Sequence, residues 1–413
     1  MSSRLKVFIL TSSTCLVVLL LIGAVTGRSA STETPYKQLA VYSEVLHRIK
    51  SEYVEEPDMK SVTLGAINGL LEAIDPFASY LNPDQYKQYL KHQESRKAGV
   101  GLIISKKFGY VGVVDSIPGS PAARQGLSTG DMIESINNIA TRDMPLAYAE
   151  LLLQGEPNTT VELSVLRVRN PEPMKITLTR ALLRLPSASA KLVEPGIGLL
   201  QIPVLDAGKV KESVSAIEQL QKQGAKKLIL DLRNNGWGKP EDGIALANLF
   251  IEKGLLAYVA GQKVERKDYV AEPGRAIFRS LPLVVLVNRG TAAGAEVAAA
   301  ALLESKRAEL IGERTYGDAA IRRPVTLDDG SAVILSVAKF YSPSGKAIQD
   351  TGVTPNYLVA DSEGLTDTNE EAPQPSEPRE EASEDAILKR AIEILKGKQS
   401  AWFWFARPAA QAA

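Results

Sequence analysis

The chain has 413 residues, of which 45% are hydrophobic and 23% are charged, as in an ordinary globular protein of two or three domains. Lys plus Arg and Asp plus Glu both number 48, so no overall electric field favours nucleic acid as a partner. Cys15 is the one cysteine, which excludes an internal disulfide, and His47 and His92 are the only histidines. The composition therefore argues against a Ser-His-Asp triad and a histidine-rich metal site, and we expect neither a metal nor a cofactor.

The first 28 residues predict a membrane anchor. Arg4 and Lys6 precede an apolar stretch over residues 7–27, which has roughly the 20 residues that span a bilayer. Ala30 offers only a weak cleavage site, so an uncleaved anchor is favoured over a cleaved signal peptide. Because positive charges stay inside, residues 1–28 predict a single-pass protein of a bacterial inner membrane, with its bulk facing the periplasm or extracytoplasmic side.

Residues 36–95 are expected to be helical. Apolar residues recur at helical spacing and form two faces: Leu39, Val41, Val45, Ile49 and Tyr53, then Leu64, Ile67, Leu70, Leu71 and Ile74. The string Asp75–Leu81 breaks the pattern and restarts the chain.

A small β-rich module is expected over residues 98–180. Strands are predicted from Gly99 and over Val111–Ile117, and Pro118-Gly119-Ser120-Pro121-Ala122 begins a short helix. A second helix is expected from five apolar residues, namely Met144, Leu146, Leu151, Leu152 and Leu153.

Residues 190–360 alternate strands with helices, which predicts an α/β body with a largely parallel sheet. The stretch 281–288 is a buried strand, residues 289–294 are a turn of small residues, and Ala295–Lys306 is a strong helix former with Glu296 in its first turn. This geometry presents a side chain at a helix N-terminus, where amide groups can hold an oxyanion. Yet the turn contains neither Ser nor Cys.

The C-terminal region has two parts. Residues 361–384 are acidic and rich in Pro and Ser, so they are predicted to be a disordered linker. Residues 385–413 carry a short amphipathic helix over 386–396 and four consecutive aromatics, Trp402–Phe405. The aromatics suggest either an interfacial membrane contact or a partner's groove, or else they fold back onto the protein's own surface.

Several of these strings resemble the carboxyl-terminal processing, or tail-specific, serine peptidases (S41-type), which carry a PDZ domain and a Ser–Lys dyad. The module's Gly119-Ser120-Pro121-Ala122-Ala123 and Gly130-Asp131-Met132-Ile133 are similar to a PDZ domain. Ser342–Gln349 and Gly352–Asn356 match the family's closing motif almost residue for residue. The resemblance covers roughly residues 39–360 and implies a multidomain α+β and α/β fold.

The catalytic positions depart from the family. Alignment places Ala293 where the family has its nucleophilic Ser, Asp318 where it has the general-base Lys, and Arg322 where it has the Gln that positions this Lys. Trp237 and Gly238 align with the oxyanion-hole glycines. Trp237 either crowds this hole or caps the following helix. Thr291 is a weak candidate nucleophile that more readily caps the helix or closes the turn.

Asp318 suggests an internal anion for the N-terminus of the helix that follows the turn. A carboxylate at position 318 would meet the free N–H groups and positive dipole end of the helix after the turn, with Arg322 or Arg314 alongside.

The resemblance therefore implies a catalytically degenerate member. By analogy with PDZ domains, Val100, Gly101, Leu102 and Ile103 would bind the C-termini of unfolded or exported proteins. The chain would act as a scaffold or regulator, possibly beside an active paralogue or adaptor. The alternatives are an active serine-type endopeptidase with an atypical site, and a structural membrane protein whose grooves bind nothing.

Overall fold

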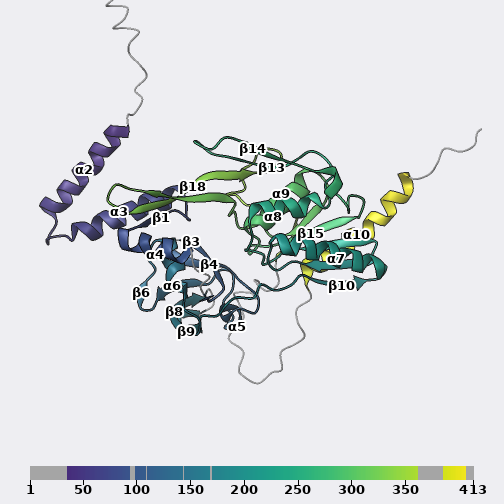
Figure 1. The fold of residues 1–413 in the computed structure, drawn as a ribbon, viewed down its shortest axis with the longest axis horizontal. Coiled ribbons are helices and arrows are strands. Elements are labelled where there is room, and N and C mark those ends of the chain that lie inside the picture. Colours follow the sequence, from purple (N-terminus) through teal and green to yellow (C-terminus); the bar gives the residue numbers. More distant parts are fainter. Residues whose placement is uncertain are drawn as a thin grey trace, which may run out of the picture. The chain divides into compact units, whose positions relative to one another are not determined.

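A computed structural model describes residues 35–93, 98–107, 109–142, 144–167, 170–360 and 385–405 (Figure 1). The predicted anchor over residues 1–28 and the predicted linker over 361–384 lie outside the described residues. The chain divides between Ala66 and Ile67 into two compact units. Among the described helices, none combines the length and apolar character needed to cross a membrane.

The expected helical region contains three helices, which are α2 (Pro35–Glu52), α3 (Met59–Ile74) and α4 (Pro83–Gln93). Between α3 and α4 the string at Asp75 forms a turn and then the short strand β1 (Ser79–Leu81), as the predicted break requires. The sequence did not reveal where β1 pairs: it joins β18 (Ala332–Tyr341) in an antiparallel sheet of the C-terminal half.

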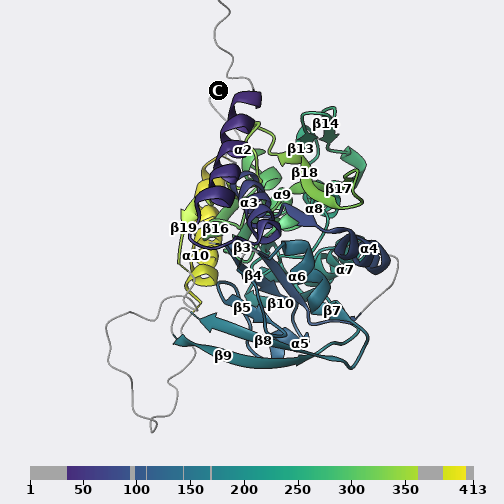
Figure 2. The same ribbon diagram turned by 90° about the vertical axis from the view of Figure 1, so that its left-hand side faces the viewer.

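The β-rich module is an antiparallel sheet in the order β3 (Leu102–Lys107), β4 (Tyr110–Ser116), β5 (Met132–Ile136), β8 (Thr160–Arg167) and β9 (Asn170–Thr179), with β6 (Ile139–Ala140) beside β5. Figure 2 shows the long β8–β9 pair at the opposite edge of this sheet from β3. Helix α5 (Pro121–Arg124) starts at a Ser120 cap, and β2 (Ala98–Gly99) pairs with β7 (Gln154–Gly155). Helix α6 (Leu146–Leu153) packs against β3 and β5.

The α/β body is built on a second sheet in the order β10 (Ser189–Glu194), β11 (Ile197–Gln201), β12 (Lys227–Asp231), β15 (Leu283–Val287), β16 (Glu309–Gly312) and β19 (Tyr357–Leu358). The strands from β11 to β19 run parallel, as predicted, and β10 alone is antiparallel to its neighbour.

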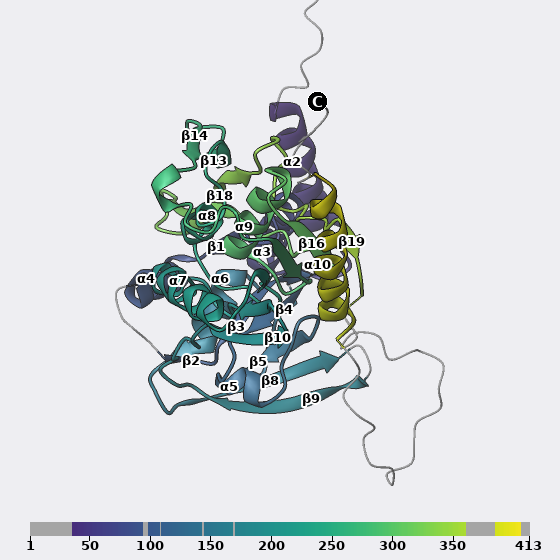
Figure 3. The ribbon, with the colours of Figure 1, turned by 90° about the vertical axis from the view of Figure 1, so that its right-hand side faces the viewer.

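Side chains along each strand alternate between the two faces of this sheet, and different helices pack against each face. Leu230 and Val285 face the core formed with α7 (Ala207–Lys222), α8 (Pro240–Asn248) and α9 (Ala293–Glu304). On the other face, Ile229 packs with the helix α10 (Ala386–Phe405), and Figure 3 shows α10 and α7 on opposite sides of the sheet. The helix predicted over 386–396 thus extends through the backbone of residues 397–405, whereas the role of the aromatic side chains stays a prediction.

A third sheet adds β13 (Leu255–Ala260) and β14 (Lys267–Val270) to one side of β18, and β17 (Ala320–Thr326) pairs along β18 as well. The short 3-10 helix η1 (Pro273–Arg275) follows β14. This sheet positions the site, because β17 carries Arg322 and begins directly after Asp318 and Ala319.

The close approach of α8 and α9 gives a stability prediction. A Cβ added at Gly243 would lie 1.9 Å from the Gly294 carbonyl oxygen, so Gly243→Ala should lower the free energy of unfolding by about 1–3 kcal/mol or more despite alanine's better helix propensity. In contrast, Gly69→Ala in α3 would meet no atom within 4 Å and should raise it by about 0.5–1 kcal/mol. Urea unfolding measures the free energy of unfolding of both variants. The same change in this free energy for Gly243→Ala and Gly69→Ala would contradict the close packing of α8 on α9.

Candidate active site of a serine-peptidase fold

Thr291 closes the turn between β15 and α9. Its hydroxyl donates to the Leu232 carbonyl oxygen at 2.8 Å and accepts from the Asn288 amide at 3.0 Å, and the residue is completely buried. These bonds tie the end of β15 to the end of β12. The preference for a turn-closing role is confirmed, and the hydroxyl of Thr291 is not presented to any reacting group.

Ala293 is the first residue of α9 and has a φ of 52°, in the left-handed region. A residue with a Cβ pays about 1–2 kcal/mol for this conformation. The strained strand–turn–helix geometry predicted to present a nucleophile is therefore present, with a methyl group at its tip. Ala292 caps the helix with its backbone alone.

Glu296 binds the neighbouring loop. Its carboxylate accepts hydrogen bonds from the amides of Gly317 at 2.7 Å and Asp318 at 2.8 Å, and from the Thr315 hydroxyl. The side chain is fully buried, and this burial raises its pKa to about 8 while the three donors oppose the shift. The sequence had marked Glu296 only as a first-turn acid, because its loop partners are distant in sequence.

The Asp318 carboxylate forms an ion pair with Arg322, and the Arg322 guanidinium carbon lies 3.9 Å from the centre of the Phe77 ring. Of the two arginines predicted beside it, Arg314 instead donates to the Thr351 carbonyl.

The prediction that the Asp318 carboxylate binds the N-terminal amides of α9 is wrong: within the described residues, its hydrogen bond goes to Arg322. The reason is that the backbone amide of Asp318 already faces α9 through Glu296, which turns the side chain toward β17.

The three positions that align with the family's catalytic residues line one cavity of about 410 Å³, together with Trp237 and Gly238. Ala293, Asp318 and Arg322 are thus brought together as predicted, whereas Thr291 does not line this cavity. None of the described lining residues is Ser, Thr or Cys. Lys239 contributes an amine, but the cavity offers no hydroxyl or thiol for it to activate.

Trp237 and Gly238 form one wall of this cavity. The Leu205 amide donates to the Trp237 carbonyl oxygen at 2.9 Å. Gly238 has a φ of 144°, and an added Cβ would lie 2.3 Å from the Leu205 carbonyl oxygen, so only glycine fits. The Trp237 side chain is 45% exposed and also lines the adjoining groove, which agrees with crowding of the cavity rather than with capping of α8.

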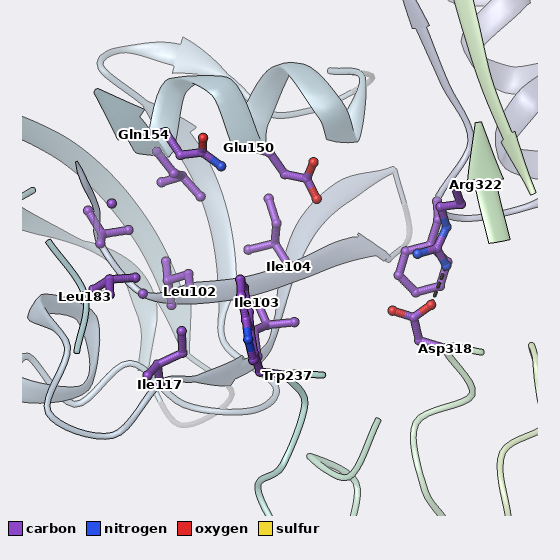
Figure 4. A pocket seen from close by; sticks show the side chains of 15 residues that line it. Leu102, Ile103, Ile104, Ile117, Glu150, Gln154, Leu183, Trp237, Asp318 and Arg322 are labelled. Carbon is purple, nitrogen blue, oxygen red and sulfur yellow. Dashed lines mark hydrogen bonds and ion pairs between the residues drawn. The ribbon is translucent and has the colours of Figure 1, made fainter. Parts of the chain in front are cut away.

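That groove is a second cavity of about 510 Å³, and it contains all four residues predicted to bind peptide, Val100, Gly101, Leu102 and Ile103 (Figure 4). Trp237, Asp318 and Arg322 line it as well, so the groove joins the cavity around Ala293.

The amides of Val100 and Gly101 lie in the loop before β3. In the described part of the chain, neither amide has a hydrogen-bond partner. The loop also requires its glycine, because Gly101 has a φ of 81° and an added Cβ would lie 2.2 Å from the Ser120 Cβ.

Helix α6 borders the groove in a way that the sequence did not reveal. Of the apolar residues of this helix expected beside the groove, Leu153 lines the cavity, whereas Met144, Leu146 and Leu151 are buried and do not line it. Glu150, which was not expected there, also lines the cavity. The Glu150 side chain is accessible but surrounded by the cavity walls. Desolvation there raises its pKa to about 7, with Arg322 lowering it and Asp318 raising it further. Helical periodicity places Glu150 on a solvated face, and the residue is exposed there, but the pattern does not reveal that Arg322 and Asp318 lie near it.

Two contacts join the module to the α/β body. The Asp115 carboxylate on β4 accepts from the Gly236 amide at 3.3 Å, and burial raises the pKa of Asp115 to about 7. The Tyr316 hydroxyl bonds to Ser105 on β3, and its ring meets that of Phe77 edge-on at 6.2 Å. These contacts place the groove beside the residues at the start of β17.

An antiparallel module with a glycine-containing loop before its edge strand, joined to a parallel sheet with a strained strand–turn–helix, defines a PDZ-containing serine-peptidase fold. Residues 196–359 match the model of peptidase family S41, and residues 112–167 match a PDZ domain model.

Named relatives agree with this class. Carboxy-terminal processing protease CtpA of Bacillus subtilis is 33% identical over 365 residues, which cover 86% of this chain and 77% of that protein. The carboxyl-terminal-processing protease of Synechocystis sp. is 34% identical over 319 residues, covering 75% and 74%. Among solved structures, the photosystem II D1 C-terminal processing protease is 30% identical with a TM-score of 0.63, covering 78% of this chain and 92% of that one. The chain belongs to the S41 family of carboxyl-terminal processing peptidases.

Burial of Glu296 predicts a pH dependence of stability. Its folded-state pKa of about 8 lies above its ordinary value of 4.5, so the native state binds the extra proton between these values. Its contribution to stability is therefore complete below about pH 4.5 and is lost as the pH rises through about 8. In Glu296→Gln, which resembles the protonated acid, the free energy of unfolding should fall less steeply from pH 5 to pH 8. Denaturant titrations test this, with Glu218→Gln on the exposed side of α7 as the control. Equal slopes in wild type and Glu296→Gln would contradict it.

Proposed function

We propose that this chain is a non-proteolytic, membrane-anchored member of its family that binds the C-termini of exported proteins. One observation carries the proposal: Ala293 occupies the tip of the strained turn in a cavity whose described lining has neither hydroxyl nor thiol.

Acyl transfer needs a nucleophile, a base and oxyanion donors. The methyl group of Ala293 has no lone pair with which to attack a carbonyl. At the base's position, the Asp318 carboxylate is committed to Arg322 and would repel a developing oxyanion. Loss of a nucleophile or base alone lowers the rate by about 10⁶ in a serine protease.

The geometry beside β3 supports peptide binding. β3 is an edge strand of the module, so an extended peptide can pair with it, and α6 forms the other wall. The unpartnered amides of Val100 and Gly101 lie at the start of β3, where they would receive the ligand's terminal carboxylate. An edge strand with such a loop needs no catalytic residue in order to bind.

The location completes the proposal. Arg4 and Lys6 before the apolar residues 7–27 support a single-pass anchor in a bacterial inner membrane, with the groove on the periplasmic or extracytoplasmic side. There the chain would hold unfolded or exported proteins by their C-termini, as a scaffold or as a regulator of an active paralogue or adaptor.

Family membership supports one alternative, an active serine-type endopeptidase with an atypical site. In that case Thr291 is the remaining candidate nucleophile of the turn. Its burial and its bonds to Leu232 and Asn288 argue against this function.

Binding is tested with labelled peptides ending in an apolar residue. The free carboxylate should bind at least about tenfold more tightly than the amidated peptide, because hydrogen bonds to a charged group contribute roughly 1.5–3 kcal/mol. Fluorescence anisotropy with the full chain in detergent measures both affinities. Equal affinities for the two peptides would argue against carboxylate recognition.

Catalysis is tested with a disordered substrate that carries a C-terminal tag. Wild type and Thr291→Ala should both leave it intact, since neither contains a usable nucleophile. The double variant Ala293→Ser/Asp318→Lys restores a nucleophile and a base. The triple variant, with Trp237→Gly added to open the cavity, should cut the substrate into shortened fragments. Mass spectrometry follows the products. Cleavage by wild type that Thr291→Ala abolishes would establish the alternative function.

A further inference from the structure

Glu150 is a carboxylate with no partner on the wall of the groove. Within the described residues it forms neither a hydrogen bond nor an ion pair, although its side chain points into the cavity (Figure 4). Arg322, a cation that also lines this cavity but comes from β17, is bound to Asp318 and lies over the Phe77 ring. When Glu150 is ionised, at a pH above its pKa of about 7, the side chains of Glu150, Asp318 and Arg322 together leave one negative charge uncompensated.

The opposite end of the groove is apolar. Leu102, Ile117, Leu153 and Leu183 line the cavity into which the loop of Val100 and Gly101 opens. Figure 4 shows Leu102, Ile117 and Leu183 grouped around the start of β3. A terminal carboxylate at the amides of that loop would therefore place the ligand's last side chain among hydrocarbon groups.

The register of an extended ligand connects the two ends. With its carboxylate at the start of β3, the ligand runs antiparallel to that strand, and every second side chain faces α6. Glu150 lies one helical turn before Leu153, a rise of about 4.5 Å, and two ligand residues span about 6.6 Å. The last side chain then lies beside Leu153 and the third from the end faces Glu150, within reach of a long basic side chain.

We propose that Glu150 selects ligands that carry Lys or Arg as the third residue from their carboxyl end and an apolar residue at the end. This rests on the proposed binding function and names its ligand class. An acidic residue at the same place would be repelled by the ionised Glu150, so the groove discriminates by repulsion as well as by attraction.

Three labelled heptapeptides test the selection. Each ends in Ala-Leu with a free carboxylate, and the residue before Ala is Lys, Gln or Glu. The full chain in detergent at low salt should bind the Lys peptide about tenfold more tightly than the Gln peptide, a difference of ~1.4 kcal/mol. The Glu peptide should bind more weakly than both.

Variants assign the effect to one side chain. Glu150→Gln should bring the Lys and Gln peptides within about twofold of each other, and Glu150→Lys should reverse the order in favour of the Glu peptide. Glu156→Gln, an exposed glutamate that does not line the groove, should keep the wild-type order. Circular dichroism checks that each variant is folded.

The outcomes separate the two proposals. Equal binding of the three peptides by wild type, or an unchanged Lys preference in Glu150→Gln, overturns the role of Glu150 while carboxylate recognition stands. If an amidated Lys peptide binds as tightly as the free one, or if no peptide binds, the proposed function fails and the selection fails with it.

Discussion

The buried carboxylate of Glu296 is the interaction on which the site depends. It lies in the first turn of α9 and holds the amides of Gly317 and Asp318 and the hydroxyl of Thr315. A fully buried carboxylate is costly unless its oxygens are satisfied, and three donors satisfy them here. The bond between α9 and this loop determines how far Ala293 lies from Asp318, and it also fixes the start of β17, which carries Arg322.

In this site the backbone geometry of the turn is present without the side chain that would act as a nucleophile. Ala293 keeps the left-handed backbone at the tip of the turn, and Thr291 still ties β15 to β12, yet the described residues that line the cavity beside Ala293 include no Ser, Thr or Cys. The backbone strain is therefore maintained by the surrounding packing rather than by any function of the side chain. The groove beside β3 differs in this respect, because its free amides and edge strand remain suited to a ligand.

Much of the fold could be predicted from the sequence, because local pattern determines it. Alternating strands and helices indicated the parallel sheet, and the small residues before α9 indicated the turn, although not the left-handed backbone of Ala293 within it. The pairing of β1 with β18 could not be predicted, since Ser79 and its partner Ile334 come from opposite ends of the described chain. Periodicity identifies a strand but not a distant neighbour.

For the site, too, local motifs could be predicted from the sequence, whereas contacts between residues distant in sequence could not. Alignment of motifs placed Ala293, Asp318 and Arg322 together, and the structure agrees. It did not show that Glu296 already occupies the loop amides, so the carboxylate of Asp318 was assigned to the wrong partner. Glu150 was missed because its environment comes from β17 and the loop before it, elements far from α6 in sequence. Such electrostatic neighbours exist only after the module has docked on the α/β body.

The most direct measurement concerns the fate of a peptide that has bound. A peptide with a free carboxylate is held at saturation with the full chain for several days, then released by denaturation and weighed by mass spectrometry. The account predicts recovery of the intact mass alone, because a ligand in this groove meets a methyl group where an attacking oxygen is required. Time-dependent loss of residues from the bound peptide, in a preparation free of other peptidases, would contradict it.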